Sequence, residues 1–171
     1  MDEFKVFKTF KERGEWTELL FMAKAMFHGY KISKPWGESS AFDVGVASGR
    51  RILRVQVKST SNRISTGYYC QFKPNFFTQD YTLDQIDFFA GYVIPQDVWY
   101  IIPARLLLGV HRKTGLMLCP MGPPGRACYN HERYREAWRL MLPRQKKVEP
   151  GKAPAPKGRH VKARHGSAGK K

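Results

Sequence analysis

Acidic residues are scarce in this chain. Its 171 residues contain 14 Asp or Glu against 30 Lys or Arg, so the formal net charge is +16. Ten basic residues and one acid lie in residues 143–171, which gives that segment +9 and leaves +7 for residues 1–142. A basic excess on both parts makes a polyanion the expected partner, because each phosphate contact releases counterions. The alternative is a basic protein that uses its charge only to avoid aggregation.

Cysteines and long apolar runs are also few. The three cysteines, Cys70, Cys119 and Cys128, form no CxxC pair, which excludes a disulfide framework and fits a reducing compartment. No apolar run approaches the roughly 20 residues of a membrane helix. Residues 1–18 are charged throughout, unlike a signal peptide. We therefore expect a cytoplasmic protein without a membrane partner.

The hydrophobic pattern predicts one domain over residues 1–142 and a disordered basic tail over residues 143–171. A helix is predicted over residues 16–28, with Gly29 ending it, because apolar residues recur at i, i+3, i+4, i+7 spacing: Trp16, Leu19, Leu20, Ala23, Met26 and Phe27. These residues form its expected apolar face. A second helix is predicted around residues 134–142. Apolar runs at residues 86–94 and 98–102 predict a buried pair of strands, and shorter strands are predicted at residues 30–34 and 67–72. Together these elements indicate an α/β (α+β) fold.

A β-hairpin is the clearest local signal. Residues 42–48 and 51–59 are strand-like and flank Gly49-Arg50, which suits a two-residue type II′ turn. With this loop, paired positions add up to 99, so Asp43 lies across from Gln56. Lys58 lies two residues further along the same face, because the side-chain period of a strand is two.

This face suits phosphodiester hydrolysis. Asp43 supplies an anionic oxygen for a hard divalent cation, and Gln56 adds a neutral carbonyl oxygen. The Lys58 ammonium can lie near the attacking water or the phosphate, where it favours the developing charge. The alternative interpretation is a solvated strand face without chemistry.

Glu18 is the fourth candidate catalytic residue. On the predicted helix it shares a row with Met22 and Ala25, whereas Thr17 belongs to a row expected to face water. A carboxylate on an apolar row is costly without a partner, and we expect a metal ion or Lys58 to be that partner. The predicted metal ligands are therefore Asp43, Gln56 and Glu18.

Polar residues around the hairpin are candidates for contact with the DNA backbone. They flank the predicted site on both sides and carry hydroxyl, amide or guanidinium groups that bind phosphate. The set is Ser39, Ser40, Arg54, Ser59, Thr60, Asn62 and Arg63.

A zinc site is a weaker hypothesis. His111, Cys119, Cys128 and His131 have ligand chemistry, but their spacing matches no standard zinc knuckle. Scattered structural residues are the favoured interpretation.

Three motifs together resemble the PD-(D/E)XK nuclease superfamily. They are Glu18, the loop at residues 34–40 leading to Phe42-Asp43, and the strand at residues 55–60. The similarity is closest to the branch of group I intron-encoded homing endonucleases and related restriction-like nucleases, and it extends more loosely to residue 142.

The resemblance implies a restriction-endonuclease-like mixed sheet flanked by helices. It implies that Asp43 is the central metal ligand, that Gln56 occupies the usual Asp/Glu position, that Lys58 is the motif lysine and that Glu18 is the first-helix acid. It also implies Mg²⁺ dependence with Mn²⁺ as a substitute, double-stranded DNA as substrate, and a homodimer or homotetramer. Phe42 replaces the proline of the motif, and Gln56 removes one negative charge from the metal site.

Several functions fit this resemblance. The first is an endonuclease cutting double-stranded DNA, including an intron-associated homing endonuclease. The second is a structure-selective nuclease of the junction-resolvase or repair type. The third is a DNA-binding protein that has lost catalysis, and the retained acids and lysine argue against it.

Overall fold

Two β-sheets organise the protein. The computed structural model describes residues 7–37, 39–73, 80–109, 113–121 and 127–143, so the predicted tail lies outside the described residues apart from Pro143. The larger sheet has the strand order β1-β2-β3-β6-β7, with β1 Ile32–Ser33, β2 Val44–Ser48, β3 Arg51–Thr60, β6 Phe88–Val93 and β7 Val98–Pro103. The smaller sheet has the order β4-β5-β8, with β4 Arg63–Ile64, β5 Gly67–Gln71 and β8 Gly115–Leu118.

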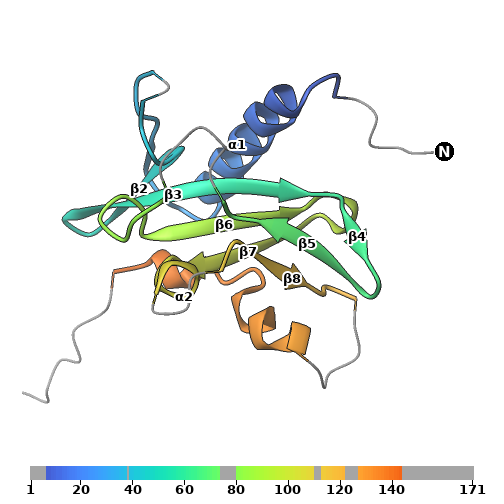
Figure 1. Ribbon diagram of the computed structural model, residues 1–171. Coiled ribbons are helices and arrows are strands. Elements are labelled where there is room, and N and C mark those ends of the chain that lie inside the picture. The colour runs from blue at the N-terminus through green and yellow to red at the C-terminus, as the bar shows by residue number, and fades with distance from the viewer. Residues whose placement is uncertain (1–6, 38, 74–79, 110–112, 122–126, 144–171) are drawn as a thin grey trace, which may run out of the picture.

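The larger sheet is mixed, as predicted. Strands β3 and β6 run parallel, whereas the other neighbouring pairs in this sheet are antiparallel. Helix α1 (Phe10–Phe27) covers one face (Figure 1). The smaller sheet covers the other face, together with α2 (Arg105–Leu108) and the 3₁₀ helix η2 (Ala127–Tyr134). The flanking helices implied by the resemblance are therefore present on one face and largely replaced by strands on the other.

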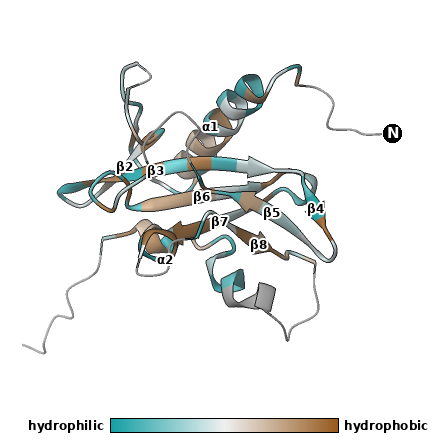
Figure 2. Ribbon diagram, in the orientation of Figure 1, coloured by the Kyte–Doolittle hydropathy of each residue, from teal (hydrophilic) through white to brown (hydrophobic). Residues whose placement is uncertain are grey.

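Strands β6 and β7 are buried on both faces, which explains their unbroken apolar sequence. Ala90 of β6 and Ile101 of β7 belong to the core under α1. Phe89 and Ile102, their chain neighbours, belong to the core under the smaller sheet. In Figure 2 β7 has strongly hydrophobic residues and none that is strongly hydrophilic, whereas β3 mixes strongly hydrophobic and strongly hydrophilic residues. Polar side chains therefore gather on β3, near the edge of the core.

Helix α1 begins at Phe10, six residues before the predicted start. Thr9 and Glu12 form a capping box: Thr9 Oγ1 accepts a hydrogen bond from the Glu12 amide (3.1 Å), and Glu12 Oε2 accepts one from the Thr9 amide (3.3 Å). This reciprocal pair satisfies amide groups that a helix leaves without partners at its start. The helix ends as predicted, with Gly29 at a φ of 82°.

The predicted buried face of α1 was wrong. Thr17, Phe21 and Ala25 are buried, whereas Met26 and Phe27 are 60% and 83% exposed. Thr17 was expected to face water, but its hydroxyl donates to the Arg13 carbonyl (2.7 Å) and bonds Ser59 Oγ (3.0 Å). Apolar residues lie on all sides of this helix, so periodicity alone did not fix which side packs against the sheet.

The predicted final helix is broken into two 3₁₀ segments, η2 and η3 (Trp138–Met141). Glu136 lies between them with a φ of 45°, outside helical geometry. Its carboxylate accepts hydrogen bonds from the Trp99 amide and from Trp138 Nε1, both at 2.7 Å. The bond to Trp99, near the start of β7, and the bond to Trp138 of η3 hold the chain in a conformation that a continuous α-helix excludes. Among the described residues, no helix is long and apolar enough to cross a membrane.

The zinc hypothesis gains no support. His111 lies outside the described residues. The described part of the chain contains no group of three or more His, Cys, Asp or Glu side chains that could hold a metal ion. Any metal site in this part must therefore use fewer protein ligands of these types.

Candidate active site

The hairpin has the predicted register. Strands β2 and β3 pair from Val44 opposite Val55 to Ser48 opposite Arg51, so paired numbers add up to 99. Gly49 has a φ of 63°, the left-handed value that a type II′ turn needs at its first central position. Just before the first of these pairs, the Asp43 amide also donates to the Val55 carbonyl at 3.0 Å. This extension places Asp43 beside Gln56.

Asp43 continues the hydrogen bonding to β3 just before β2 begins. Its Oδ2 accepts a hydrogen bond from the Val57 backbone amide at 2.7 Å. The same oxygen accepts a second one from Gln56 Nε2, also at 2.7 Å. Because Gln56 turns its amide nitrogen toward Asp43, its carbonyl oxygen is directed elsewhere and can serve as a ligand. The side chains predicted to share one face are in direct contact.

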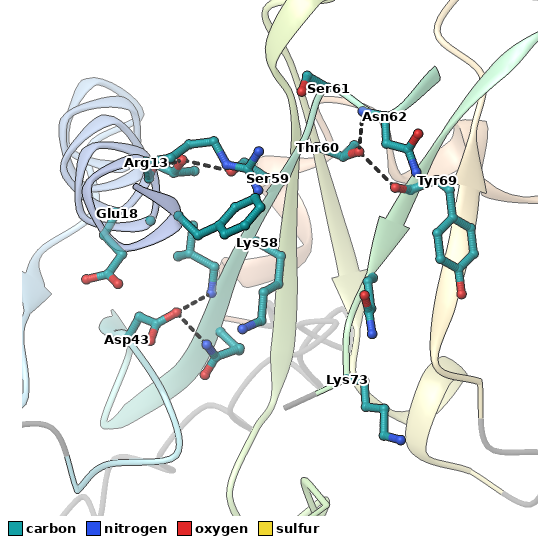
Figure 3. Close-up of a pocket in the computed structure, with 16 residues that line it drawn as sticks. Arg13, Glu18, Asp43, Lys58, Ser59, Thr60, Ser61, Asn62, Tyr69 and Lys73 are labelled. Carbon is teal, nitrogen blue, oxygen red and sulfur yellow. Dashed lines mark hydrogen bonds between the residues drawn. The ribbon is translucent and has the colours of Figure 1, made fainter. Parts of the chain in front are cut away.

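Lys58 joins this pair in one cleft of about 630 Å³ between α1, β3 and β5. In Figure 3 Glu18 and Asp43 lie on one side of the cleft, Tyr69 and Lys73 lie on the other, and Lys58 projects between them. The Lys58 ammonium is 6.0 Å from the centroid of the Tyr81 ring. Its positive charge opposes part of the rise that burial produces in the pKa of the Asp43 carboxyl group.

Glu18 has a different partner from the one predicted. Its Oε2 forms an ion pair with Lys34 Nζ at 2.8 Å, not with Lys58. Lys34 precedes the loop that leads to Asp43, so this pair ties α1 to that loop. The Glu18 side chain is 20% exposed and lines the same cleft as Asp43. It is therefore positioned to bind a cation shared with Asp43.

Asp43 carries an unfavourable negative charge. Burial raises the pKa of its carboxyl group to about 6, and repulsion by Glu18 adds to this rise. The Val57 amide, the Lys58 ammonium and the Gln56 amide act in the opposite direction without cancelling it. A divalent cation between Asp43 and Glu18 would relieve both the burial cost and the repulsion.

The donor set fits a hard cation. Asp43 and Glu18 supply carboxylate oxygens, and Gln56 supplies a neutral carbonyl oxygen. Mg²⁺ binds proteins through one or two carboxylates and keeps several waters, so a larger cluster of acids is not required. The predicted ligands therefore supply the kind of oxygen donors that Mg²⁺ binds.

Four predicted DNA-contact residues line clefts on the two sides of Asp43. Ser59, Thr60 and Asn62 line the cleft that contains Lys58, and Ser40 lines a second cleft next to α1. Thr60 is already engaged, because its hydroxyl donates to the Tyr69 carbonyl (2.8 Å) and accepts from the Asn62 amide (3.0 Å). Thr60 thus shapes the cleft wall through contacts within the protein.

The other three predicted DNA-contact residues line neither cleft. Ser39 and Arg63 are exposed. Arg54 makes a two-pronged ion pair with Asp87, with its Nε 2.9 Å from Oδ2 and a terminal nitrogen 3.2 Å from Oδ1. A guanidinium held in this way is less available to a phosphate. The role of Arg54 is therefore structural, because its ion pair with Asp87 links β3 to the start of β6.

Several residues that line the cleft containing Lys58 were not predicted from the sequence. They come from α1, from β5 and from the segments that follow β3 and β5, and they include two basic side chains. The set is Phe10, Arg13, Gly14, Thr17, Ser61, Tyr69, Gln71 and Lys73. The helical members were detectable from spacing, because Gly14 and Glu18 are four residues apart and share a face. The β5 members depend on contacts between the two sheets, which local patterns do not encode.

Comparisons with known proteins identify the family and the fold of the chain. The family model described as PD-(D/E)XK endonuclease matches residues 8 to 141. Among solved structures, the chain is similar to the bacterial homing endonuclease I-Ssp6803I, with a TM-score of 0.62 and 21% sequence identity. That match covers 79% of this chain and 92% of the other. No curated protein gave a significant match.

The fold is therefore restriction-endonuclease-like, and the predicted resemblance is confirmed over the described domain. The family match covers more than half of the chain and includes Glu18, Asp43, Gln56 and Lys58. This chain belongs to the PD-(D/E)XK endonuclease family.

Proposed function

We propose that this endonuclease hydrolyses phosphodiester bonds of double-stranded DNA with Mg²⁺ as its cofactor and Mn²⁺ as a substitute. The observation that carries the proposal is the direct contact of Asp43 with Gln56, in a cleft shared with Lys58 and Glu18. The net charge of +16 supports a nucleic acid substrate. The cytoplasm is the proposed location, because the cysteines fit a reducing compartment.

Each residue has a role in this proposal. Asp43, Glu18 and the Gln56 carbonyl would hold the metal, and Val57 fixes Asp43 by its backbone amide. Lys58 would place its ammonium beside the scissile phosphate, where it stabilises the negative charge of the transition state. When bound, Mg²⁺ supplies further positive charge for a reaction whose barrier must fall by roughly 20 kcal/mol. Gln56 makes the site one charge less negative than an acid would.

We further propose that the protein acts as a homodimer or homotetramer. One cleft cuts one strand, so two clefts related by a twofold axis would cut both strands of a duplex. Leu19, Met26 and Phe27 are 60–83% exposed on the outer side of α1, and this apolar surface is available for subunit contact. Light scattering should give a mass of at least two chains, and a single-chain mass would contradict the proposal.

The biological role that we propose is intron-associated homing, because the similar solved structure is a homing endonuclease. The alternatives are a structure-selective nuclease of the junction-resolvase or repair type and a DNA-binding protein without catalysis. The position of the gene inside or outside an intron tests the homing role directly.

One assay separates the enzymatic alternatives. Purified protein is incubated with plasmid and with branched DNA, in Mg²⁺, Mn²⁺ or EDTA, beside Lys58→Ala and the charge-matched control Lys31→Ala. Lys31 is exposed and lines neither cleft. We expect metal-dependent cutting of linear and plasmid duplex that Lys58→Ala loses and Lys31→Ala keeps. Preference for branched DNA would favour the structure-selective alternative, and binding without cutting in either metal would refute the proposed enzyme.

A further inference from the structure

Two clefts meet at α1. The first contains Lys58 and lies between α1, β3 and β5, and we name it the β5 cleft. The second, of about 320 Å³, lies between α1 and residues 34–43, and we name it the loop cleft. Both clefts are lined by the same three residues, Gly14, Glu18 and Asp43. They are therefore the two halves of one groove, joined at the candidate metal site.

Gly14 is the least expected of the three shared residues. It lies inside α1, where glycine stabilises a helix less than alanine does. It is not one of the glycines with positive φ, so its backbone conformation does not require glycine. Apart from its two chain neighbours and the nearby backbone of its own helix, a Cβ atom built on it would meet no atom of the described residues within 4 Å. Neither backbone geometry nor packing within the described residues explains the missing side chain.

The groove carries basic side chains on both sides of Gly14. Arg13 and Lys73 line the β5 cleft, as Figure 3 shows, and Lys11 and Lys34 line the loop cleft. Glu15 also lines the loop cleft and Lys34 is paired with Glu18, so the excess of positive charge lies in the β5 cleft, where Lys58 joins Arg13 and Lys73. A basic cleft that leads to carboxylates matches a polyanionic chain that reaches a bound metal. Gly14 lies about one helical turn before Glu18 on the same face, so it lies next to the site where the metal would bind.

We propose that one DNA strand lies along the whole groove and that its sugar-phosphate backbone crosses α1 against the bare backbone of Gly14. This inference rests on the proposed function and assigns Gly14 as a positioning residue. The missing side chain lets the strand approach α1 closely, which brings the scissile phosphate up to Asp43 and Glu18. Any side chain at this position would occupy the path of the strand and hold that phosphate away from the metal site.

The test adds side chains of increasing size at this position. Gly14→Ala and Gly14→Leu are compared with the parent and with Ala23→Gly, which lies on the same helix, is exposed and lines neither cleft. Ala23→Gly changes helix stability in the opposite direction without adding atoms. Single-turnover cleavage of plasmid DNA is measured in Mg²⁺. DNA affinity is measured by fluorescence anisotropy of a labelled duplex in a Lys58→Ala background, so that the duplex stays intact.

Gly14→Ala should melt at the same temperature as the parent or a few degrees higher, because its Cβ meets open space. Its cleavage rate should nevertheless fall about tenfold, and that of Gly14→Leu about 100-fold, as expected for a misplaced scissile group. DNA affinity should weaken in the same order. Ala23→Gly should lower the melting temperature and leave cleavage and affinity close to those of the parent.

Parental cleavage and affinity in both Gly14 variants would overturn the inference, and so would a Gly14→Ala variant that fails to fold. A parent that binds duplex without cutting it would refute the proposed enzyme, while the affinity series would still decide whether the strand crosses Gly14. A parent that does not bind DNA would refute both.

Discussion

Asp43 and Asp87 lie beside the same strand and differ in one respect. Each accepts a hydrogen bond from a backbone amide of β3, Asp43 from Val57 and Asp87 from Arg54. Burial acts to raise the pKa of both carboxyl groups. The Arg54 guanidinium nevertheless holds the pKa of Asp87 below its usual value, whereas Asp43 rises to about 6.

The two pKa values differ because the side chains that bond the two carboxylates differ in charge. Asp87 bonds a cation of the protein, and Asp43 bonds the neutral amides of Gln56 and Val57. Within the described residues, no basic side chain forms a hydrogen bond or an ion pair with Asp43. The negative charge of Asp87 is thus neutralised by a side chain of the protein, whereas the negative charge of Asp43 would be stabilised by a bound cation. Four predictions test this distinction, from the largest expected effect to the smallest.

The largest difference should appear in catalysis. Asp43→Asn should lower the rate of metal-dependent DNA cleavage by at least about 100-fold, because it removes the central anionic ligand. Asp87→Asn should cleave at close to the parental rate when assayed well below its melting temperature. Single-turnover rates in Mg²⁺ provide the measurement. Equal losses of cleavage rate in the two variants would contradict the assignment of Asp43 as a metal ligand and Asp87 as a structural residue.

Metal binding should weaken in acid. Since the pKa of Asp43 is about 6, its ionised fraction is high at pH 7 and falls about tenfold per pH unit below 6. Calorimetric titration with Mg²⁺ at pH 5 to 8 should therefore show affinity lost as pH falls through 6. Asp43→Asn serves as the reference for residual binding. An affinity that stays constant from pH 7 to pH 5 would contradict this assignment.

Folding stability should change in opposite directions in the two variants. In EDTA at pH 7, Asp43→Asn should raise the free energy of unfolding by about 1–3 kcal/mol, because it removes a carboxylate that is costly to ionise. Asp87→Asn should lower it by about 1–3 kcal/mol, because it leaves Arg54 without its anionic partner. Urea unfolding followed by circular dichroism measures both changes.

Folding stability should also depend on pH in opposite directions through Asp43 and Asp87. With a raised pKa, Asp43 costs stability above pH 6, and this cost is relieved as pH falls from 6 toward 4. With a lowered pKa, Asp87 contributes stability that is present above the unfolded-state pKa near 4 and is lost below it. Asp43→Asn should remove the dependence between pH 6 and 4. The distinction fails if both variants destabilise the protein equally at pH 7.

The smallest effect is expected at the Glu18–Lys34 pair. Lys34 is half exposed, so solvent screens the interaction, and Lys34→Ala should lower the free energy of unfolding by less than about 1 kcal/mol. Glu18→Gln should have a similarly small effect on stability but a much larger one on cleavage. A Glu18→Gln variant with parental cleavage would show that this acid is structural, like Asp87.

Local patterns sufficed for the hairpin. The two-residue loop and the alternation along residues 51–59 predicted its register, and with it the contact of Asp43 with Gln56. A short turn and a period of two leave few alternative pairings. The sequence also contained the Thr9–Glu12 capping box that starts α1, although this signal was overlooked.

Patterns failed where partners come from distant parts of the chain. Glu18 pairs with Lys34 because the loop before β2 folds back on α1, and a helical row of Glu18 with Met22 and Ala25 carries no information about that loop. Arg54 was a plausible phosphate ligand until the start of β6 brought Asp87 to it. The basic residue Lys73 reaches the cleft only because the smaller sheet packs on the larger one.

By itself, the sequence determined the pairing of β2 with β3, the contact of Asp43 with Gln56 and the family, since each depends on residues close together or on motifs. Only the tertiary structure decided which side of α1 is buried, where the last helix breaks, and how the clefts join at Gly14. Those features depend on contacts between distant segments: packing selects one face of an evenly apolar helix, and Glu136 gives up helical geometry to bond β7. Burial among such contacts also gives Asp43 its raised pKa.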